Sequence, residues 1–287
     1  MALPKFTMKQ LMEAGVHFGH HTRRWNPLMG AYVYGVKDKI HIINLNKTAP
    51  MLYRALDALE KITAAGGKVL FVATKYQAKD IVKDAAERCG QFYVNNRWLG
   101  GMITNWSTVS QSIRRLKKLE ADIENFEKLG LTKKEVGVMQ KESGKLREIF
   151  GGILEMHGTP QAVVIIDMPR EMNAVREAKV LDIPTIAIAD TNANPELVDY
   201  PIPGNDDAAR AIQLYCDLFV DAIVSGIEKR LGGAQGKKVV SDDMIPDVGE
   251  KIEEEAKEKE AKLKSKASEQ RETRREKLAE KLEEKGE

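Results

Sequence analysis

Short apolar runs alternate with amphipathic segments over most of the chain. Residues 68–74, 162–167 and 185–190 are nearly continuous apolar runs rich in β-branched side chains, which is typical of strands buried on both faces. Residues 91–94 and 200–202 are shorter, weaker runs. The segments that carry helical spacing of apolar positions are 75–88, 170–181 and 206–229. This alternation predicts a parallel sheet with helices on its faces, an α/β fold.

A long charged segment at residues 104–150 interrupts the alternation. Its first arm, 104–126, has apolar residues every three or four positions, and its second arm occupies 132–150. Between the arms, Gly130 can end one helix, and Thr132 with Glu135 can begin the next as a capping box. The pattern predicts an antiparallel helical hairpin of the coiled-coil type. At 1.5 Å per residue, each arm of about 20 residues would reach about 30 Å.

Further regions flank the predicted sheet on both sides. Residues 1–66 predict a helix at 7–14, a β-hairpin at 32–36 and 39–43, and a long amphipathic helix at 46–65. Residues 232–287 are rich in Glu, Lys, Arg and Ala, with too few leucines for a coiled-coil seam, so they predict a disordered or lone-helix tail. The expected organisation is an N-terminal layer at 1–66, an α/β core at 67–103 and 151–231, the hairpin at 104–150 and the tail at 232–287.

Composition limits how the protein could bind nucleic acid and which cellular compartment it occupies. Its 287 residues include 45 Lys plus Arg and 43 Asp plus Glu, so the net charge is only +2. If such a nearly neutral chain binds nucleic acid, its cations must be concentrated on particular surfaces. Cys89 and Cys216 stand in apolar helical surroundings, which argues for a reducing compartment and against a disulfide framework. No leader-like apolar region opens the chain and no apolar run approaches about 20 residues, so we expect a cytoplasmic protein without a membrane partner.

Two short segments gather cationic, aromatic and amide side chains together with glycine. They are GVHFGHHTRRWNP at 15–27 and NNRWLGGMITNW at 95–106. Rings and guanidinium groups stack on unpaired bases, Arg and Lys neutralise phosphates, and glycine lets a sugar-phosphate chain approach closely. All three Trp residues fall in these segments. The alternative is that the Trp rings only fasten the loops to the core.

The candidate RNA-binding residues come from these two segments, from the turn of the predicted β-hairpin and from the first arm of the helical hairpin. They are His17, His20, His21, Arg23, Arg24, Trp25, Asn26, Lys37, Lys39, Asn95, Asn96, Arg97, Asn105, Arg114 and Arg115. Within the second segment, we expect Trp98 to pack in the core and Arg97 to face RNA.

Together with IHIINL at 40–45, followed by Lys47 and Thr48, and IPGNDDA at 202–208, the two segments resemble the universal S-two family of bacterial small-subunit ribosomal proteins. The resemblance covers about residues 6–227 and leaves out the tail. It implies a flavodoxin-like sheet of five parallel strands in the order 2-1-3-4-5. It also implies a structural, non-enzymatic role in the ribosome. Such a protein binds small-subunit ribosomal RNA, supports late assembly and contacts other small-subunit proteins, including the multi-OB protein S-one in species that have it.

Two other classes of protein are weighed against this interpretation. A phosphosugar- or nucleotide-handling enzyme could use the same sheet, but KYQA at 75–78 follows the first core strand where a glycine-rich phosphate loop would be needed. We therefore expect neither a small-molecule substrate nor a cofactor. A module that only binds proteins would use apolar surface loops, whereas the loops here are basic and aromatic.

A metal site is the remaining chemical alternative. Asp167 and Asp190 end two predicted strands, and Asp206 and Asp207 begin a predicted helix, so capping of helices explains them better than a hard-metal site does. His17 and His20 have the spacing of metal ligands, but no Cys or carboxylate partner stands near them in the sequence. We therefore expect these histidines to stack or to contact phosphate, and we expect no metal.

Overall fold

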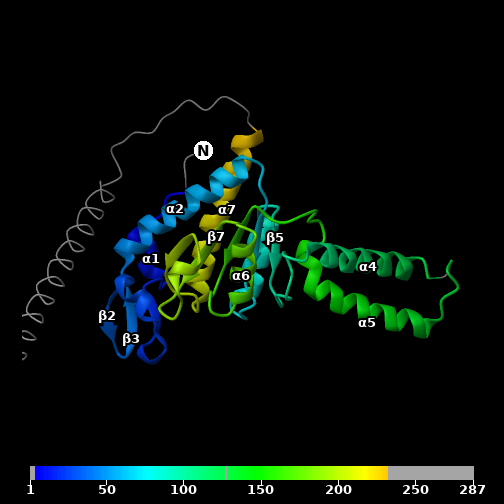
Figure 1. The fold of residues 1–287 in the computed structure, drawn as a ribbon, viewed down its shortest axis with the longest axis horizontal. Coiled ribbons are helices and arrows are strands. Elements are labelled where there is room, and N and C mark those ends of the chain that lie inside the picture. Colours follow the sequence, from blue (N-terminus) through cyan, green and yellow to red (C-terminus); the bar gives the residue numbers. More distant parts are fainter. Residues whose placement is uncertain (1–3, 127, 232–287) are drawn as a thin grey trace, which may run out of the picture. The chain divides into compact units, whose positions relative to one another are not determined.

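A sheet of five parallel strands forms the centre of the structure, a computed structural model that describes residues 4–126 and 128–231 (Figure 1). The strands are β4 (Val69–Val72), β5 (Phe92–Val94), β6 (Ala162–Ile165), β7 (Thr185–Ala189) and β8 (Tyr200–Pro203). Their spatial order is β5-β4-β6-β7-β8, and all neighbours pair in parallel. The predicted α/β fold is confirmed, since each apolar run that predicted a strand contains one.

Helices cover both faces of this sheet. They are α2 (Leu45–Ala64), α3 (Lys79–Arg88) and α7 (Ala209–Leu231) on one face and α6 (Met172–Val180) on the other. Because successive side chains of a strand point to opposite faces, Phe71 belongs to the core under α2 and α7, and Leu70 belongs to the core under α6. Burial on both faces explains the unbroken apolar character of the central strands.

The N-terminal residues build a second, antiparallel sheet with the order β1-β3-β2. The elements of this layer are α1 (Met8–Glu13), β1 (Phe18–His21), η1 (Thr22–Arg24), η2 (Pro27–Tyr32), β2 (Val33–Lys37) and β3 (Ile40–Ile43). The sequence pattern does not predict β1, because FGHH lacks both alternation and β-branched residues. Contact with the large sheet holds it instead, since a Cβ on Gly19 would lie 2.6 Å from Thr191 Cγ2.

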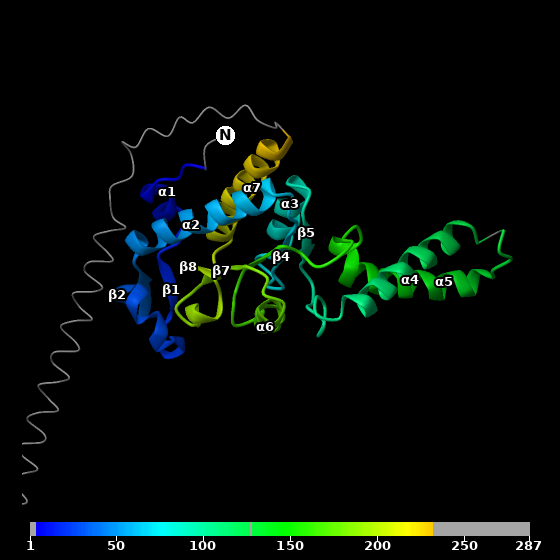
Figure 2. The same ribbon diagram turned by 45° about the horizontal axis from the view of Figure 1, so that its top comes forward.

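Two long helices follow the second basic-aromatic segment and lie side by side in both views (Figures 1 and 2). They are α4 (Trp106–Glu124) and α5 (Lys133–Phe150), followed by η3 (Gly151–Ile153). The predicted capping box of Thr132 and Glu135 is confirmed at the start of α5. Val109 of α4 and Phe150 of α5 pack in the hydrophobic core between the sheet and α6, so the ends of the two helices nearest the sheet are buried. Val138 of α5 is 61% exposed and does not contribute to that core.

Helices α3 and α7 begin three or more residues later than their apolar patterns predict. Helix α3 begins at Lys79 rather than at residue 75, because residues 75–78 form a turn after β4. Helix α7 begins at Ala209 rather than at residue 206, because Asp206 belongs to a buried cluster of ion pairs. In both cases a tertiary contact of a charged side chain outweighs helix propensity.

None of the helices in the described ranges is both long enough and apolar enough to cross a membrane. The charged tail predicted at 232–287 lies outside the described residues.

Helices α2 and α7 are in close contact at Gly226. A Cβ there would lie 2.0 Å from Thr63 Oγ1 and 2.5 Å from the backbone oxygen of Glu60. Because a backbone oxygen cannot turn aside, Gly226→Ala should lower the free energy of unfolding by about 1–3 kcal/mol. Gly144→Ala is the matched control, since no described atom lies within 4 Å of its Cβ position in α5, and it should raise stability by about 0.4–1 kcal/mol. Equal stability of both variants in urea unfolding would contradict this packing.

Candidate nucleic-acid interface

The carboxyl ends of the five parallel strands share one edge of the large sheet, which we call the carboxyl rim. The residues that follow the strands along this rim are Asn95 and Asn96 after β5, Lys75 after β4, Asp167 after β6, Asp190 after β7 and Asp206 after β8. Neighbouring strands are about 4.8 Å apart, so β5 and β7 stand about 14 Å from one another. The rim therefore has two ends that a ligand can reach separately.

The first segment docks on the carboxyl rim at β7, the strand next to the edge strand β8. The backbone N–H of His20 donates to Thr191 Oγ1 at 2.9 Å, and the N–H of Asn26 donates to the Thr191 carbonyl at 2.7 Å. These bonds place η1 on the outside, where Arg23 and Arg24 are exposed. Two long cationic side chains thus extend from a fixed backbone into solvent.

Aromatic and polar residues around η1 have mixed roles. Trp25 is 41% exposed, and its ring lies 5.1 Å from that of the buried His41, so one face is packed while part of the ring is open. His21 is exposed and its Nδ1 accepts from the Arg23 N–H. His17 packs against Phe18, and burial lowers its pKa. Trp25 is therefore able to stack on a base, and so is Phe18 of the same segment, which is 47% exposed.

The turn of the small sheet presents two more cations. Lys37 and Lys39 are both exposed, and Lys39 and Asp38 have positive φ values of 64° and 52°. A positive φ is uncommon outside glycine, and it folds the chain tightly between β2 and β3. Both lysines therefore stand at the tip of the small sheet.

The second segment lies at the β5 end of the rim. Asn95 Nδ2 donates to the Lys79 carbonyl at 3.2 Å, and Asn96 Oδ1 accepts from Lys79 Nζ at 2.9 Å. Arg97 is exposed, while Trp98 is only 7% exposed and belongs to the core of α6. The expectation that Trp98 packs is thus confirmed.

The remaining candidates are Asn105 at the N-terminus of α4 and two arginines in the middle of that helix. Asn105 Oδ1 accepts from the hydroxyls of Ser107 and Thr108, so it organises the first turn of the helix. Arg115 pairs with Glu142 of α5 at 2.5 Å and thereby joins the two helices. Arg114 bonds only to Ser110 of its own helix among the described residues and is exposed.

The structure therefore does not gather the candidates into one patch. His17 to Asn26, Lys37 and Lys39 lie on the small sheet near β7, whereas Asn95 to Arg97 and the α4 residues lie beyond β5 (Figures 1 and 2). Exposed side chains at both ends can contact two separate parts of one large ligand. A small molecule could not span them.

One carboxylate that the sequence analysis did not single out holds the second segment in shape. Glu177 of α6 accepts from Trp98 Nε1 at 2.9 Å and from the backbone N–H of Gly101 at 2.8 Å. Its second oxygen accepts from the N–H of Ile103 at 3.1 Å and from both the N–H and the hydroxyl of Thr104. Partial burial disfavours its charge, but these bonds lower the pKa of Glu177. The sequence does not reveal this role, because a single Glu on a helix has no motif that links it to a distant loop.

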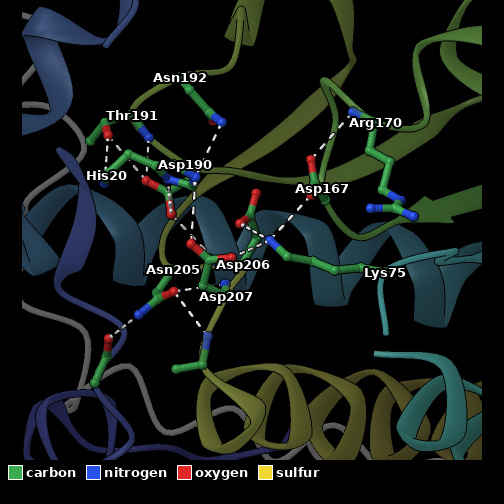
Figure 3. A network of polar contacts seen from close by, with 12 residues as sticks. His20, Lys75, Asp167, Arg170, Asp190, Thr191, Asn192, Asn205, Asp206 and Asp207 are labelled. Atoms are coloured by element: carbon green, nitrogen blue, oxygen red, sulfur yellow. Dashed lines mark hydrogen bonds and ion pairs between the residues drawn. The ribbon is translucent and has the colours of Figure 1, made fainter. Parts of the chain in front are cut away.

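The middle of the rim is filled by an ionic cluster that also involves the first segment (Figure 3). Lys75 Nζ lies 2.8 Å from Asp206 Oδ1 and 2.6 Å from Asp207 Oδ1. It also lies 3.1 Å from Asp167 Oδ2. His20 Nδ1 lies 3.0 Å from Asp190 Oδ2, and its Nε2 lies 3.4 Å from Asp207 Oδ2. Side chains from four strand ends and from β1 thus meet in one cluster.

The proximity of these groups shifts their pKa values. The interaction with Asp190 raises the pKa of His20 to about 8, so the imidazole is charged at neutral pH. Burial, together with repulsion from Asp190 and Asp167, raises the pKa of Asp206 to about 7. Burial disfavours the ammonium group of Lys75, but the carboxylates around it raise its pKa. Two cations therefore offset the acids that the strand ends bring together.

This cluster corrects the interpretation of Asp206 and Asp207 as helix caps. Asn205 Oδ1 accepts from the N–H groups of Asp207 and Ala208 ahead of α7, so Asn205 has the capping role. The cluster also supplies the carboxylates that His20 lacks in the sequence. His20, Asp190 and Asp206 present donor atoms within 4.8 Å of one another, but a His20 that is protonated at neutral pH has no free lone pair for a metal ion, and Lys75 already pairs with Asp206.

Replacing Glu177 should test its role as the organiser of the second segment. Glu177→Gln replaces one acceptor oxygen by an NH2 group, so the part-buried donors that face that oxygen lose their acceptor, and the change should cost about 1–3 kcal/mol of unfolding free energy at pH 7. Because the folded-state pKa of Glu177 lies below its ordinary value of 4.5, its stabilisation is complete above pH 4.5 and is lost as the pH falls through the folded value. The difference between wild type and variant should therefore shrink in acid.

The matched control for this prediction is Glu155→Gln. Glu155 pairs with Lys117, and its side chain is 75% exposed, so the change should alter stability by less than about 0.5 kcal/mol. Denaturant unfolding from pH 3 to pH 7 measures both variants. A Glu177→Gln effect that is as small as that of the control, or that does not depend on pH, would contradict the role assigned to Glu177.

Comparison with known proteins identifies the family. The family model described as ribosomal protein S2 matches residues 11–226. A small ribosomal subunit protein uS2 of Paramagnetospirillum magneticum is 52% identical over 261 residues, which cover 89% of this chain and 98% of the relative. The uS2 proteins of Rhodospirillum rubrum and Chelativorans are 54% and 55% identical over 86% and 81% of this chain, and over 94% and 86% of their own lengths. The chain belongs to the ribosomal protein S2 family, a family of structural proteins and not of enzymes.

Proposed function

We propose that this chain is a structural component of the small ribosomal subunit, serves translation in the cytoplasm and binds small-subunit ribosomal RNA. The observation that carries the proposal is the family match over residues 11–226, which include every candidate RNA-binding residue. The exposed side chains at the two ends of the carboxyl rim have suitable chemistry. Arg23, Arg24 and Arg97 can neutralise phosphates, and Trp25 can stack on a base.

The arrangement of the rim favours binding over catalysis. Its middle, where sheets of this kind hold small ligands, contains the ion pairs of Lys75. The cations that remain exposed stand at its ends, where a long polymer can reach both groups. RNA is such a polymer, and its unpaired bases and phosphates match the residue types present.

Further details of the role extend this proposal. We propose that the chain supports late assembly of the subunit and contacts neighbouring ribosomal proteins, including S-one where it is present. Helices α4 and α5 favour contacts with several partners, because Val138 on α5 and Leu129 in the connection between the helices are exposed apolar side chains. The family resemblance is the basis for late assembly and for S-one.

The fold class is part of the same proposal. We assign the large sheet to the flavodoxin-like class, because its strand order places the second core strand, β5, at one edge beside the first. We also propose that α4 and α5 pack as a short coiled coil. Leu116 and Val136, which are buried between exposed neighbours, support this packing.

Sedimentation tests the assignment to the ribosome. In a sucrose gradient of cell lysate, an antibody against this chain should detect it with small subunits and with whole ribosomes. After magnesium is lowered to separate the subunits, it should remain with the small subunit. A chain found only at the top of the gradient would overturn the proposed function.

Salt-dependent binding tests the first segment. Replacing Arg23 and Arg24 with Ala should reduce the slope of log affinity against log salt by about 1–2 units, because each lost phosphate contact releases one counterion fewer. The control variant replaces Arg54 and Arg210, two exposed arginines on α2 and α7, and should keep the wild-type slope. An unchanged slope in the Arg23 and Arg24 variant would remove η1 from the RNA interface.

A further inference from the structure

A polar groove lies between α3, the end of β5 and the base of α5, elements that stand close together in Figure 2. Its volume is about 280 Å³. Three cations and two amides are prominent in its lining, beside the ring of Tyr93: Lys79, Lys83, Arg147, Asn95 and Asn96. The sequence analysis selected the two amides but none of the three cations, because the lysines lie on α3 and the arginine on α5, outside the two basic-aromatic segments.

The charge of the lining favours an anion. Its charged residues are three cations and one carboxylate, Glu148, so the lining has a net charge of +2. None of the described residues that line it has an aliphatic side chain. Pockets for small organic ligands are mostly apolar, and protein partners are anchored by apolar or aromatic side chains that need apolar pockets. A ligand with a regular series of negative charges fits this groove better than either of those.

Lys79 is held in place without a carboxylate partner among the described residues. Its Nζ donates to Asn96 Oδ1 at 2.9 Å, and its backbone carbonyl accepts from Asn95 Nδ2 at 3.2 Å. Both partners are neutral amides, so the full charge of Lys79 remains available to an anion. The neighbouring Lys75 is the opposite case, since three carboxylates surround its ammonium group.

Lys83 and Arg147 differ in their competing partners. Lys83 Nζ lies 4.0 Å from Glu87, and both side chains are about half exposed, so this pair contributes about 0–1 kcal/mol and a phosphate can replace the carboxylate at little cost. Arg147 Nη1 lies 3.3 Å from Glu120, whose side chain is 28% exposed. Arg147 therefore keeps this pair and meets a phosphate with its remaining guanidinium N–H groups.

Gly152 and a neighbouring depression give the groove an elongated form that suits a polymer. A Cβ on Gly152 would lie 2.1 Å from the Tyr93 carbonyl oxygen, so only glycine permits the close packing of η3 against β5 at the groove floor. A neighbouring depression of about 530 Å³ shares Lys83, Tyr93, Arg147, Glu148 and Gly151 with the groove and adds Glu87, Gly144 and Leu154, so its two cations are balanced by two carboxylates. The groove therefore continues along α3 and α5 instead of ending in a closed pocket.

From these observations we infer that the groove of Lys79, Lys83 and Arg147 binds the sugar-phosphate backbone of RNA. The inference rests on the proposed function and adds a surface to it. The groove begins at Asn95 and Asn96, directly before the exposed Arg97, so an RNA strand that contacts the second segment can continue into it. Lys79 and Lys83 each contact a phosphate, and Arg147 closes the groove from the opposite side.

Binding of the full-length chain to transcribed small-subunit ribosomal RNA tests the inference. Lys79→Gln with Lys83→Gln should reduce the slope of log affinity against log salt by about 1.4–1.8 units, from 0.7–0.9 per phosphate contact. The matched control is Lys61→Gln with Lys179→Gln. These lysines lie near the ends of α2 and α6, which lead back to the amino ends of β4 and β7, at the opposite edge of the sheet. The control should keep the wild-type slope.

The outcomes separate the groove from the proposed function. If the wild type neither binds the RNA nor sediments with small subunits, the proposed function fails. If the wild type binds and the Lys79 and Lys83 variant keeps the full slope with unchanged stability, the groove inference alone is overturned. Unfolding in urea checks stability, because Lys79 also supports Asn96.

A crosslink distinguishes RNA from a protein occupant. Cys89 and Cys216 are buried, so Lys83→Cys offers a single accessible thiol among the described residues for a photoactivatable reagent. In purified small subunits that contain this variant, the groove inference predicts a crosslink to ribosomal RNA. Crosslinks exclusively to another protein would overturn it, and Lys61→Cys provides the comparison from the opposite edge.

Discussion

The contact of Lys75 with three carboxylates is the interaction on which the rest of the structure depends. Parallel strands place their carboxyl ends side by side, and here three of those ends carry acids, Asp167, Asp190 and Asp206. Without a cation between them the acids would repel one another in a poorly hydrated place. Lys75 supplies that cation from the end of β4, and His20 supplies another from β1. Pairing of charges thus joins the small sheet to the large one.

This cluster also explains why binding is proposed at the ends of the rim. An open α/β sheet offers its natural crevice beyond the carboxyl ends of the central strands. In this chain Lys75 and its partners occupy that region, and residues 75–78 form a turn in which no glycine exposes the backbone. Surfaces remain near Thr191 on one side and around Asn95 on the other. If the proposed function is correct, this chain contacts RNA at two separate surfaces because ion pairs fill the crevice where such sheets usually bind a ligand.

Sequence reasoning succeeds here where the determinants are local. Apolar runs predict the five strands of the sheet, and Thr132 with Glu135 predicts the start of α5. It fails where the partner is distant. Strand β1 exists because it packs beside Thr191, and the five hydrogen bonds of Glu177 connect α6 to a loop more than 70 positions earlier in the chain. No spacing rule connects such residues before the fold is known.

The same distinction determines which cations can bind RNA. The net charge of +2 gives Lys75 and Lys79 the same weight, although only one of them is free to bind an anion. Three carboxylates surround Lys75, so an added phosphate would have to displace a buried ion pair at a cost of several kcal/mol. Lys79 donates to a neutral amide, so a phosphate meets an uncompensated charge. Affinity for RNA therefore depends on the partners of each cation, which the fold determines and a sum of charges does not reveal.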